Sequence, residues 1–247
     1  MELRDRVGLV TGAGRRVGQA IAVALGARGM RVAVHFNRSS AGANETVARI
    51  NAAGGAAEAF EEDLADPSTP ERLIARVAGR FGAIDVLVNS AAIMRRTPFG
   101  QVTPAAWDEI MGLNLRAPFF LSQAAAPHLA RGTGGSGGAI VNIADLAAFE
   151  TWPAYVPHGV SKGGIVNLTR ALARTLAPAI RVNAVAPGTV LLPENWTEEA
   201  TEHLRETTPL GRLGDPSDVA RAVIFLLESD YITGETIIVD GGRHVRH

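Results

Sequence analysis

Short apolar segments alternate with longer segments of helical periodicity along the whole chain. Some apolar segments are continuous, as in Val86-Leu87-Val88, which is typical of parallel strands covered on both faces. The pattern predicts strands at Val7–Thr11, Arg31–Phe36, Ala56–Glu61, Ile84–Asn89, Ala139–Ile143, Ile180–Ala184 and Thr236–Val239. It predicts helices at Arg16–Arg28, Ala43–Ala53, Thr69–Arg80, Ala105–Ala130, His158–Leu176 and Pro216–Leu227.

This alternation predicts a single α/β domain over residues 1–247. Strand–helix–strand units of this kind build a doubly wound parallel sheet with helices on both faces. The glycine-rich segment Gly132–Gly138 falls between a helix and a strand of the same alternation, so we interpret it as a flexible surface loop and not as a linker. Asp215-Pro216 and Ser68-Thr69-Pro70 are typical helix starts, with a capping side chain before or near a first-turn proline.

Composition narrows the class of protein. The 247 residues are 20% charged and 47% hydrophobic, with a formal net charge of −1, close to the globular average. Near-neutral charge argues against a general nucleic-acid binder, which needs a basic face. No stretch approaches the roughly 20 apolar residues that span a bilayer, and no apolar signal core follows the charged N-terminus. We therefore expect a cytoplasmic protein with neither a membrane nor a nucleic acid as partner.

The residues that bind metals or form disulfides are scarce. The chain has no cysteine, which excludes disulfides, thiolate metal sites and a cysteine nucleophile. The histidines outside the predicted sites lack the spacing of a metal centre, so we expect no metal.

Lysine occurs once. Of the 24 basic side chains, only Lys162 is a lysine. A compact ammonium at one position indicates a site where a planar guanidinium would not fit or function. Chance survival in an arginine-biased composition is an equal alternative.

The first predicted strand runs directly into a glycine-rich turn. Gly12, Gly14 and Gly18 allow a tight turn, let backbone N–H groups approach a pyrophosphate, and aim the positive end of the next helix at it. The position of this turn, between the first strand and the first helix, makes it stronger than an isolated glycine pattern.

The end of the second strand lacks the acidic residue that NAD-preferring folds place about 20 positions after the glycines. In its place stand His35, Asn37, Arg38 and Ser39. Arg38 and Ser39 suit a 2′-phosphate, which prefers a bidentate cation and hydroxyl donors, and Arg16 can approach the same phosphate. The sequence therefore favours NADP(H) over NAD(H). In the alternative, the two arginines are only solvated side chains on the surface.

Six segments in order carry a family resemblance. They are Thr11-Gly12 to Gly18 (similar to TGxxxGxG, with Arg16 at the middle glycine), Asp63-Leu64, Asn89-Ser90-Ala91-Ala92 (similar to NNAG), Asn114, Lys162 of YxxxK, and Pro187-Gly188. In these motifs the chain resembles the short-chain dehydrogenase/reductases over essentially its whole length. The resemblance implies a seven-stranded Rossmann sheet, a homotetramer, and a small-molecule substrate under a lid at about 189–213.

The resemblance also implies the site residues. Thr189 would contact the nicotinamide carboxamide, and Leu191, Leu192 and Trp196 of the lid indicate an apolar or flat ligand, or simple packing of the lid. The expected cofactor contacts are Gly12, Gly14, Arg15, Arg16, Val17, Gly18, His35, Asn37, Arg38, Ser39, Asp63, Leu64, Asn89, Ala91, Lys162, Pro187, Gly188 and Thr189. The expected catalytic residues are Asn114, Asp145, Tyr155, His158 and Lys162.

Within the family, the chain is most similar to the pteridine reductases. Arg16, the segment His35-Phe36-Asn37-Arg38-Ser39, and Asp145, which lies 13 residues before position 158, are features of that branch. Met94 stands where an aromatic residue would stack on pterin; methionine can pack on a ring. We expect NADPH-dependent hydride transfer to a pteridine-like C=N bond or a carbonyl. The alternatives are a 3-oxoacyl or simple ketone reductase, and an NADPH-binding pseudoenzyme.

His158 stands four residues before Lys162, where the family has its catalytic tyrosine. In one interpretation His158 is the general acid, oriented by Asp145 as a carboxylate orients histidine in hydrolase triads. In a second, Tyr155 or a water held by Asp145 delivers the proton. In a third, the site is inactive. General acid–base help is typically worth about 10²–10⁴ in rate, so a misplaced donor would leave slow turnover.

Overall fold

The computed structural model describes residues 1–135, 137–190 and 197–245. Seven strands form one parallel sheet in the order β3-β2-β1-β4-β5-β6-β7, which confirms the predicted fold class. Their bounds are β1 Val7–Val10, β2 Arg31–Phe36, β3 Ala56–Glu61, β4 Val86–Asn89, β5 Gly138–Ile143, β6 Ile180–Pro187 and β7 Thr236–Val239.

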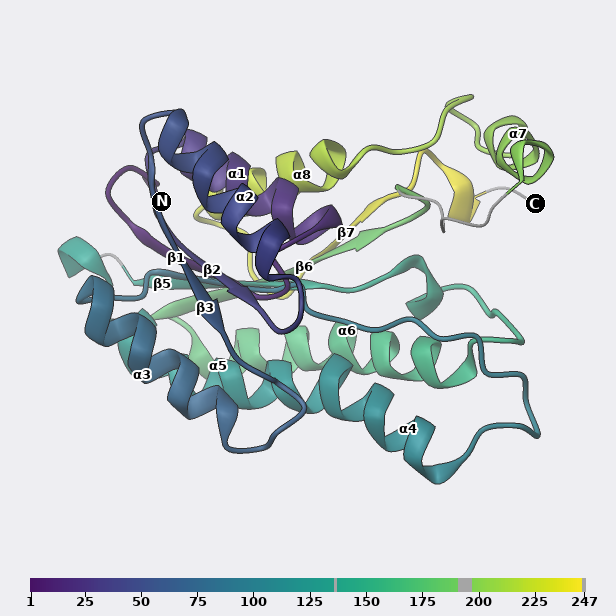
Figure 1. Ribbon diagram of the computed structural model, residues 1–247, viewed down its shortest axis with the longest axis horizontal. Coiled ribbons are helices and arrows are strands. Elements are labelled where there is room, and N and C mark those ends of the chain that lie inside the picture. The colour runs from purple at the N-terminus through teal and green to yellow at the C-terminus, as the bar shows by residue number, and fades with distance from the viewer. Residues whose placement is uncertain (136, 191–196, 246–247) are drawn as a thin grey trace.

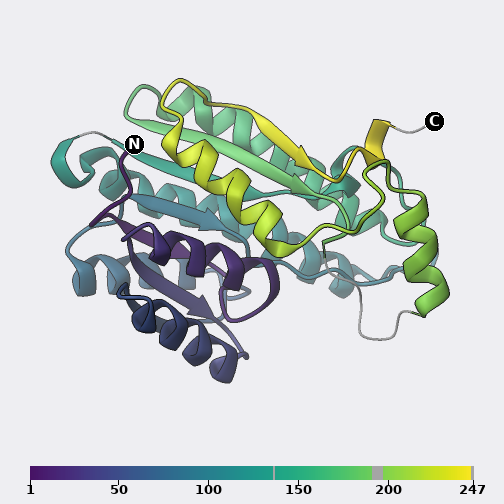
Figure 2. The ribbon, with the colours of Figure 1, turned by 90° about the horizontal axis from the view of Figure 1, so that it is seen from above.

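Helices cover both faces of the sheet (Figures 1 and 2). On one face lie α1 (Arg16–Ala27), α2 (Ser40–Ala52) and α8 (Pro216–Glu228). On the other lie α3 (Thr69–Phe81), α4 (Pro104–Met111), α5 (Ala117–Arg131) and α6 (Val156–Leu176). The short α7 (Glu198–Glu206) stands beyond the sheet, near the C-terminal end of the described chain.

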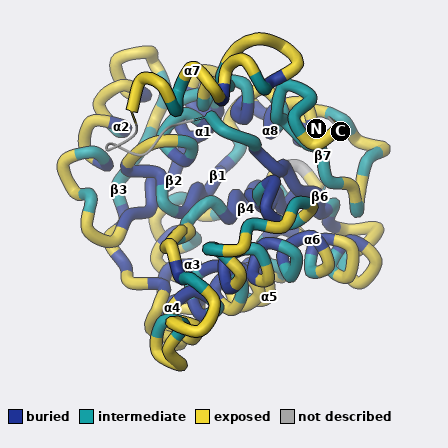
Figure 3. The backbone as a smooth tube through the Cα atoms, turned by 90° about the vertical axis from the view of Figure 1, so that its right-hand side faces the viewer, coloured by how far each residue is buried: buried dark blue, intermediate teal, exposed yellow. Residues whose placement is uncertain are grey.

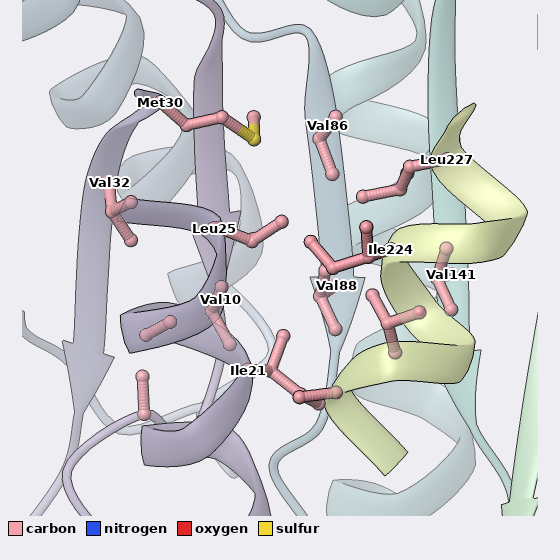
Figure 4. Packing of buried hydrophobic residues seen from close by; sticks show 14 of the residues in the cluster. Val10, Ile21, Leu25, Met30, Val32, Val86, Val88, Val141, Ile224 and Leu227 are labelled. Carbon is pink, nitrogen blue, oxygen red and sulfur yellow. The ribbon is translucent and has the colours of Figure 1, made fainter. Parts of the chain in front are cut away.

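The sheet interior explains why the strands are continuously apolar. Ile21 and Leu25 of α1 and Ile224 of α8 pack onto Val10 and Val88 of the central strands (Figure 4). A second cluster fills the opposite face. Each fully buried aliphatic side chain contributes roughly 1.5–3 kcal/mol relative to an exposed one, so both faces of the sheet require apolar residues.

The carboxyl ends of the strands, marked by the arrowheads in Figures 1 and 2, meet at one edge of the sheet, which faces the viewer in Figure 3. The chain reverses its direction of winding between β1 and β4, and ligands of open α/β sheets bind at such a switch point. The glycine turn after β1 and the segments that follow β2, β4, β5 and β6 are therefore brought to the same edge.

The predicted helix Ala105–Ala130 is interrupted, which corrects the sequence prediction. Between α4 and α5 the chain takes a π-helical turn at Gly112–Arg116, closed by the Ala117 N–H on the Gly112 carbonyl. Pro118 has no N–H for the carbonyl four residues earlier, and its ring crowds that carbonyl. The residue four earlier is Asn114, so the proline places the wider turn where a candidate catalytic residue stands. π-turns are frequent at functional sites.

Other element ends differ by a few residues from the prediction. Strand β6 extends to Pro187, and α6 begins at Val156, so His158 lies inside the first helical turn. Asp215 forms the expected capping box with Asp218. Ser68, among the described residues, makes no side-chain cap, and its hydroxyl donates to Asp66 instead. Within the same described ranges, no helix is long and apolar enough to cross a membrane.

The start of the predicted flexible loop Gly132–Gly138 is anchored. The backbone N–H of Thr133, at 2.5 Å, and its hydroxyl, at 2.9 Å, both donate to the buried Asp85 carboxylate. Asp85 also accepts from the Val7 N–H at 2.8 Å and from Arg6 at 3.1 Å. This carboxylate joins the amino ends of β1 and β4 to the loop, at the edge of the sheet opposite the candidate site.

Candidate active site

The glycine turn is built by close backbone approach. Gly12 has φ +65°, and a Cβ there would lie 2.9 Å from the Ala91 Cα. A Cβ at Gly18 would lie 2.3 Å from the Gly12 carbonyl oxygen. Side chains at these positions would push the turn away from β4 and from the start of α1.

His35 supports this turn from beneath. The Gly12 N–H donates to its Nδ1 at 3.1 Å, and its Nε2 lies 3.1 Å from the Glu62 carbonyl oxygen. An acceptor at Nδ1 fixes the neutral tautomer with hydrogen on Nε2. Burial lowers the pKa of His35 from 6.5 to about 4, which agrees with a neutral ring. His35 was predicted to contact the cofactor, and both of its ring nitrogens bond to the protein backbone.

Thr11 joins the glycine turn to the end of β4, and the sequence argument did not assign it a role. Its Oγ1 accepts hydrogen bonds from the N–H groups of Ser90 and Ala91 at 2.9 and 3.0 Å. The hydroxyl at the end of β1, directly before Gly12, was the signal that identifies this residue.

Asn89, predicted as a cofactor contact, uses its side chain for contacts within the protein. Its Nδ2 donates to Asn142 Oδ1 at 2.8 Å and approaches Ser122 Oγ at 3.4 Å. Asn89 is buried, and in the described part of the chain its Oδ1 has no hydrogen-bond partner. Its side chain therefore joins β4 to β5 and α5 beneath the site.

The start of α1 has the character of an anion site. Its N-cap residue, Arg15, makes no side-chain capping bond, and the first turn of α1 holds no acidic residue among the described positions. The first-turn N–H groups and the helix dipole favour a negative charge there, and Arg15 is exposed at the same end. Arg16 follows with φ +55°.

The loop after β2 lies against this turn. A Cβ at Gly14 would be 2.9 Å from the Ser39 carbonyl oxygen, and one at Gly42 would be 2.0 Å from the Gly14 carbonyl oxygen. Asn37 and Arg38 are exposed on this loop, and the described Ser39 makes no side-chain capping bond to α2. Donors of two neighbouring segments thus face one region, which fits a dinucleotide whose ribose carries a phosphate.

The other predicted cofactor positions lie at the same edge of the sheet. Asp63 is exposed after β3, where its Oδ1 accepts from the Ala65 N–H at 3.0 Å, and Leu64 is buried. Val17 and Ala91 are partly buried beside the glycine turn.

Asn114 is clamped by the loop that follows β4. Its Oδ1 accepts from the Ile93 N–H and its Nδ2 donates to the Ile93 carbonyl, both at 2.9 Å. Nδ2 also donates to Ser161 Oγ at 3.1 Å, and Ser161 Oγ donates to the His158 carbonyl at 2.7 Å. Ile93 and Ser161 are site residues that the sequence argument missed; Ser161 directly precedes Lys162.

His158 lies between two oxygen acceptors. Its Nδ1 is 3.3 Å from the Ile93 carbonyl oxygen, and its Nε2 is 3.6 Å from Asp145 Oδ2. The second distance exceeds that of a hydrogen bond, and within the described residues Nε2 is buried without a partner. Asp145 Oδ1 meanwhile accepts from the Ala147 N–H at 2.8 Å, which holds the carboxylate in place. The ring is therefore fixed at Nδ1 and has a free hydrogen-bonding position at Nε2.

Lys162 lies one helical turn beyond His158. Its Nζ donates to the Ile143 carbonyl at 2.7 Å. Burial lowers the pKa of Lys162 to about 8, against the opposing effect of the Asp145 carboxylate. The side chain is thus an ammonium group at neutral pH, held at the end of β5 with little competing solvent.

Tyr155 stands apart from this cluster. It is the N-cap residue of α6, and its ring packs edge-on against Trp152 with centroids 6.2 Å apart. Within the described ranges its hydroxyl makes no hydrogen bond to His158, Lys162 or Asn114. The structure therefore brings together four of the five predicted catalytic residues.

The end of β6 completes the edge. Pro187 ends the strand, the Gly188 N–H donates to the Val239 carbonyl at 2.9 Å, and Thr189 Oγ1 accepts from Arg243 at 3.0 Å. Leu191, Leu192 and Trp196 lie outside the described residues. In the ranges that are described, no group of three or more metal-ligating side chains is placed to hold an ion.

Comparison with known proteins identifies the fold family. A family model described as enoyl-(acyl carrier protein) reductase matches residues 12–244. The chain belongs to the short-chain dehydrogenase/reductase family. It is an oxidoreductase of that type.

Individual family members match over nearly their whole length. A candidate ketoacyl reductase of the granaticin polyketide synthase of Streptomyces violaceoruber is 40% identical, over 97% of this chain and 96% of its own. The 3-oxoacyl-(acyl-carrier-protein) reductase FabG of Staphylococcus aureus is 35% identical over 96% and 97%. The structure of a candidate short-chain alcohol dehydrogenase from Sinorhizobium meliloti has a TM-score of 0.92 at 38% identity, covering 100% and 99% of the two chains.

Proposed function

We propose that the protein is an NADPH-dependent carbonyl reductase in which His158 donates the proton. The observation that carries the proposal is the buried, unpartnered Nε2 of His158, 3.6 Å from Asp145 Oδ2 and beside Asn114 and Lys162. Buried polar atoms are almost always paired. One without a partner, in the family's catalytic position, is the expected mark of a group that hydrogen-bonds to substrate.

Each residue of the cluster has a distinct task. NADPH supplies the hydride for the carbonyl carbon when it is bound. His158 Nε2 donates its proton to the carbonyl oxygen, while Asp145 stabilises the imidazolium before transfer. Lys162 contributes a positive charge that stabilises the developing alkoxide. Asn114 and Ser161 hold the imidazole and the Ile93 loop in fixed positions relative to each other.

The cofactor preference rests on the two basic segments. Arg38 and Ser39 after β2, together with Arg16 in the glycine turn, provide cationic and hydroxyl donors for a 2′-phosphate. The first residues after β2 carry no carboxylate to hold a ribose 2′-hydroxyl. These features support NADP(H) over NAD(H).

The substrate class is supported by the relatives. Two of them are named as ketoacyl or 3-oxoacyl reductases, which favours a 3-oxoacyl or simple ketone substrate over a pteridine. The pteridine alternative retains Asp145 and an exposed Met94, 53% accessible, at the position expected to face pterin. The lid over residues 189–213, the single domain over residues 1–247 and the homotetramer stay predictions.

The test is a substrate and cofactor panel between pH 5 and 8. NADPH and NADH oxidation would be followed with a 3-oxoacyl thioester, simple ketones, a dihydropterin and a quinonoid dihydropterin. We expect NADPH-dependent turnover of the carbonyl substrates that rises toward acid pH, because the donor must carry a proton.

Two outcomes would contradict the proposal. Turnover confined to the pterins would assign the protein to the pteridine alternative. Tight NADPH binding without turnover of any substrate would leave an NADPH-binding module.

A further inference from the structure

A short segment after β7 reaches back to the site. Gly241 and Gly242, with φ +68° and +88°, turn the chain after β7 into a 3₁₀ turn at Arg243–Val245. Asp240 holds this turn by accepting from the Gly242 N–H at 2.9 Å and from the His244 N–H at 2.7 Å. The turn is therefore a fixed structure and not a loose tail.

This turn places one arginine on the residue expected to face nicotinamide. Arg243 Nη1 donates to Thr189 Oγ1 at 3.0 Å. Thr189 is also fixed by its own carbonyl, which accepts from the Gly214 N–H at 3.1 Å. Because Oγ1 accepts from a cation, the hydroxyl hydrogen of Thr189 is left to donate to a ligand oxygen.

Thr189 lies beyond the end of β6, the strand next to the one whose Ile143 holds Lys162. Val185 of β6 is paired with Ile143 of β5, and Ile143 holds the Lys162 ammonium. Thr189 follows Val185 on the ligand edge, beyond Pro187. A group bound between Lys162 and Thr189 would thus lie near two cations, Lys162 and Arg243.

Arg243 brings a positive charge to Thr189 from a partly buried position. Its side chain is partly buried, and in the described part of the chain its Nε is buried without a partner. Among the same residues it forms no ion pair; the Asp240 carboxylate, which contacts His244 at 2.7 Å, adds a negative charge to the same turn. A partly desolvated guanidinium acts on neighbouring charge more strongly than a surface one.

We propose that Arg243, acting through Thr189, makes the site prefer the reduced cofactor to the oxidised one. This inference rests on the proposed function, because it requires the nicotinamide to lie beside Thr189. The oxidised nicotinamide ring is a cation and the reduced ring is neutral. A fixed guanidinium therefore opposes the oxidised form and biases the protein toward reduction of its substrate.

The experiment compares the dissociation constants of NADPH, NADP⁺ and 2′,5′-ADP by calorimetry. The variants are Arg243→Gln, Arg243→Lys and, as a matched control, Arg80→Gln, which removes an exposed arginine of α3 paired with Glu58. We expect Arg243→Gln to lower the ratio of the NADP⁺ to the NADPH constant by about tenfold. Arg243→Lys should retain the ratio, and 2′,5′-ADP, which lacks nicotinamide, should bind all forms equally.

Three results would overturn the inference. An unchanged ratio in folded Arg243→Gln would exclude an effect of its charge. Equal weakening of all three ligands would show that Arg243 only supports the fold. No binding of any ligand by the wild type would remove the proposed function as well, which distinguishes the two failures. Arg243→Met, which keeps the aliphatic stem, provides the same comparison if the glutamine variant does not fold.

Discussion

Two histidines of this protein are equally buried, and they differ in the hydrogen bonding of one ring nitrogen. His35 and His158 each expose 2% of their surface. Both ring nitrogens of His35 meet the backbone, at Gly12 and Glu62. His158 meets the Ile93 carbonyl at Nδ1, whereas its Nε2 is left without a partner in the described part of the chain.

This difference distinguishes a histidine that supports the fold from one that can take part in the reaction. Leaving a buried polar group unsatisfied costs about 1–3 kcal/mol, so the protein tolerates it where a ligand completes the bond. His35 has nothing left to offer a ligand and serves to hold the glycine turn. His158 has one position to offer, and Asp145 stands beside it.

The largest expected effect is on catalysis, in His158→Gln. The amide can replace the Nδ1 contact but cannot transfer a proton. We expect turnover with NADPH to fall by about 10²–10⁴, with the dissociation constant of NADPH unchanged. Steady-state kinetics and NADPH titration measure the two separately, and His128→Gln, at a partly exposed histidine of α5, is the control.

The substitution His158→Tyr tests the same position by replacing one possible proton donor with another. It restores the residue that the family uses, but in buried surroundings packed around an imidazole. If His158 is the working acid, the tyrosine variant is slower than the wild type. A large gain would instead show that the histidine marks lost activity.

A smaller effect, on stability, is expected from His35→Leu. The leucine leaves the Gly12 N–H and the Glu62 carbonyl without their partner, so we expect a loss of roughly 2–4 kcal/mol in the free energy of unfolding. NADPH binding should weaken because the glycine turn loosens, while turnover at saturating NADPH changes little. Urea unfolding and kinetics at high NADPH test the two parts.

The same variant isolates a pH effect. Burial lowers the pKa of His35 to about 4 from 6.5, so between these values the unfolded chain binds the proton and the folded chain does not. The wild type therefore loses stability as the pH falls from about 6.5 to about 4, by up to about 3 kcal/mol from this residue. His35→Leu should lack that component, and parallel pH profiles of the two proteins would contradict the neutral, double-bonded ring.

The smallest effect is expected from Asp145→Asn. The asparagine can still accept from the Ala147 N–H, so the 3₁₀ turn at Leu146–Ala148 is kept while the negative charge beside His158 is lost. We expect turnover to fall by about tenfold, equivalent to about 1.4 kcal/mol in the barrier. Glu150→Gln, which removes a nearby carboxylate that contacts Trp152, should change it little. Equal losses of turnover in the two variants would show that Asp145 acts only as one of several nearby negative charges, without a specific contribution at His158.

Much of the fold was predictable because it depends on local pattern. Seven strand positions, the doubly wound sheet and the glycine turn follow from apolar periodicity and from backbone rules that act over neighbouring residues. The π-turn at Gly112–Arg116 was not predicted, although it is followed closely by Pro118, which cannot donate to the Asn114 carbonyl. Its consequence depends on how the turn packs against the Ile93 loop.

The residues of the site were named from the sequence, but their partners were not. The family motifs identified Asn114, Asp145, His158 and Lys162 as candidates. They did not show that the side chains of His35 and Asn89 bond within the protein. Ile93 and Arg243 came from tertiary contacts alone, whereas Thr11 and Ser161 adjoin Gly12 and Lys162 along the chain and received their roles from their contacts. A motif shows which side chains occur along the chain. Whether Nε2 of His158 keeps an unused hydrogen-bonding position depends on which atoms of distant strands and loops surround it.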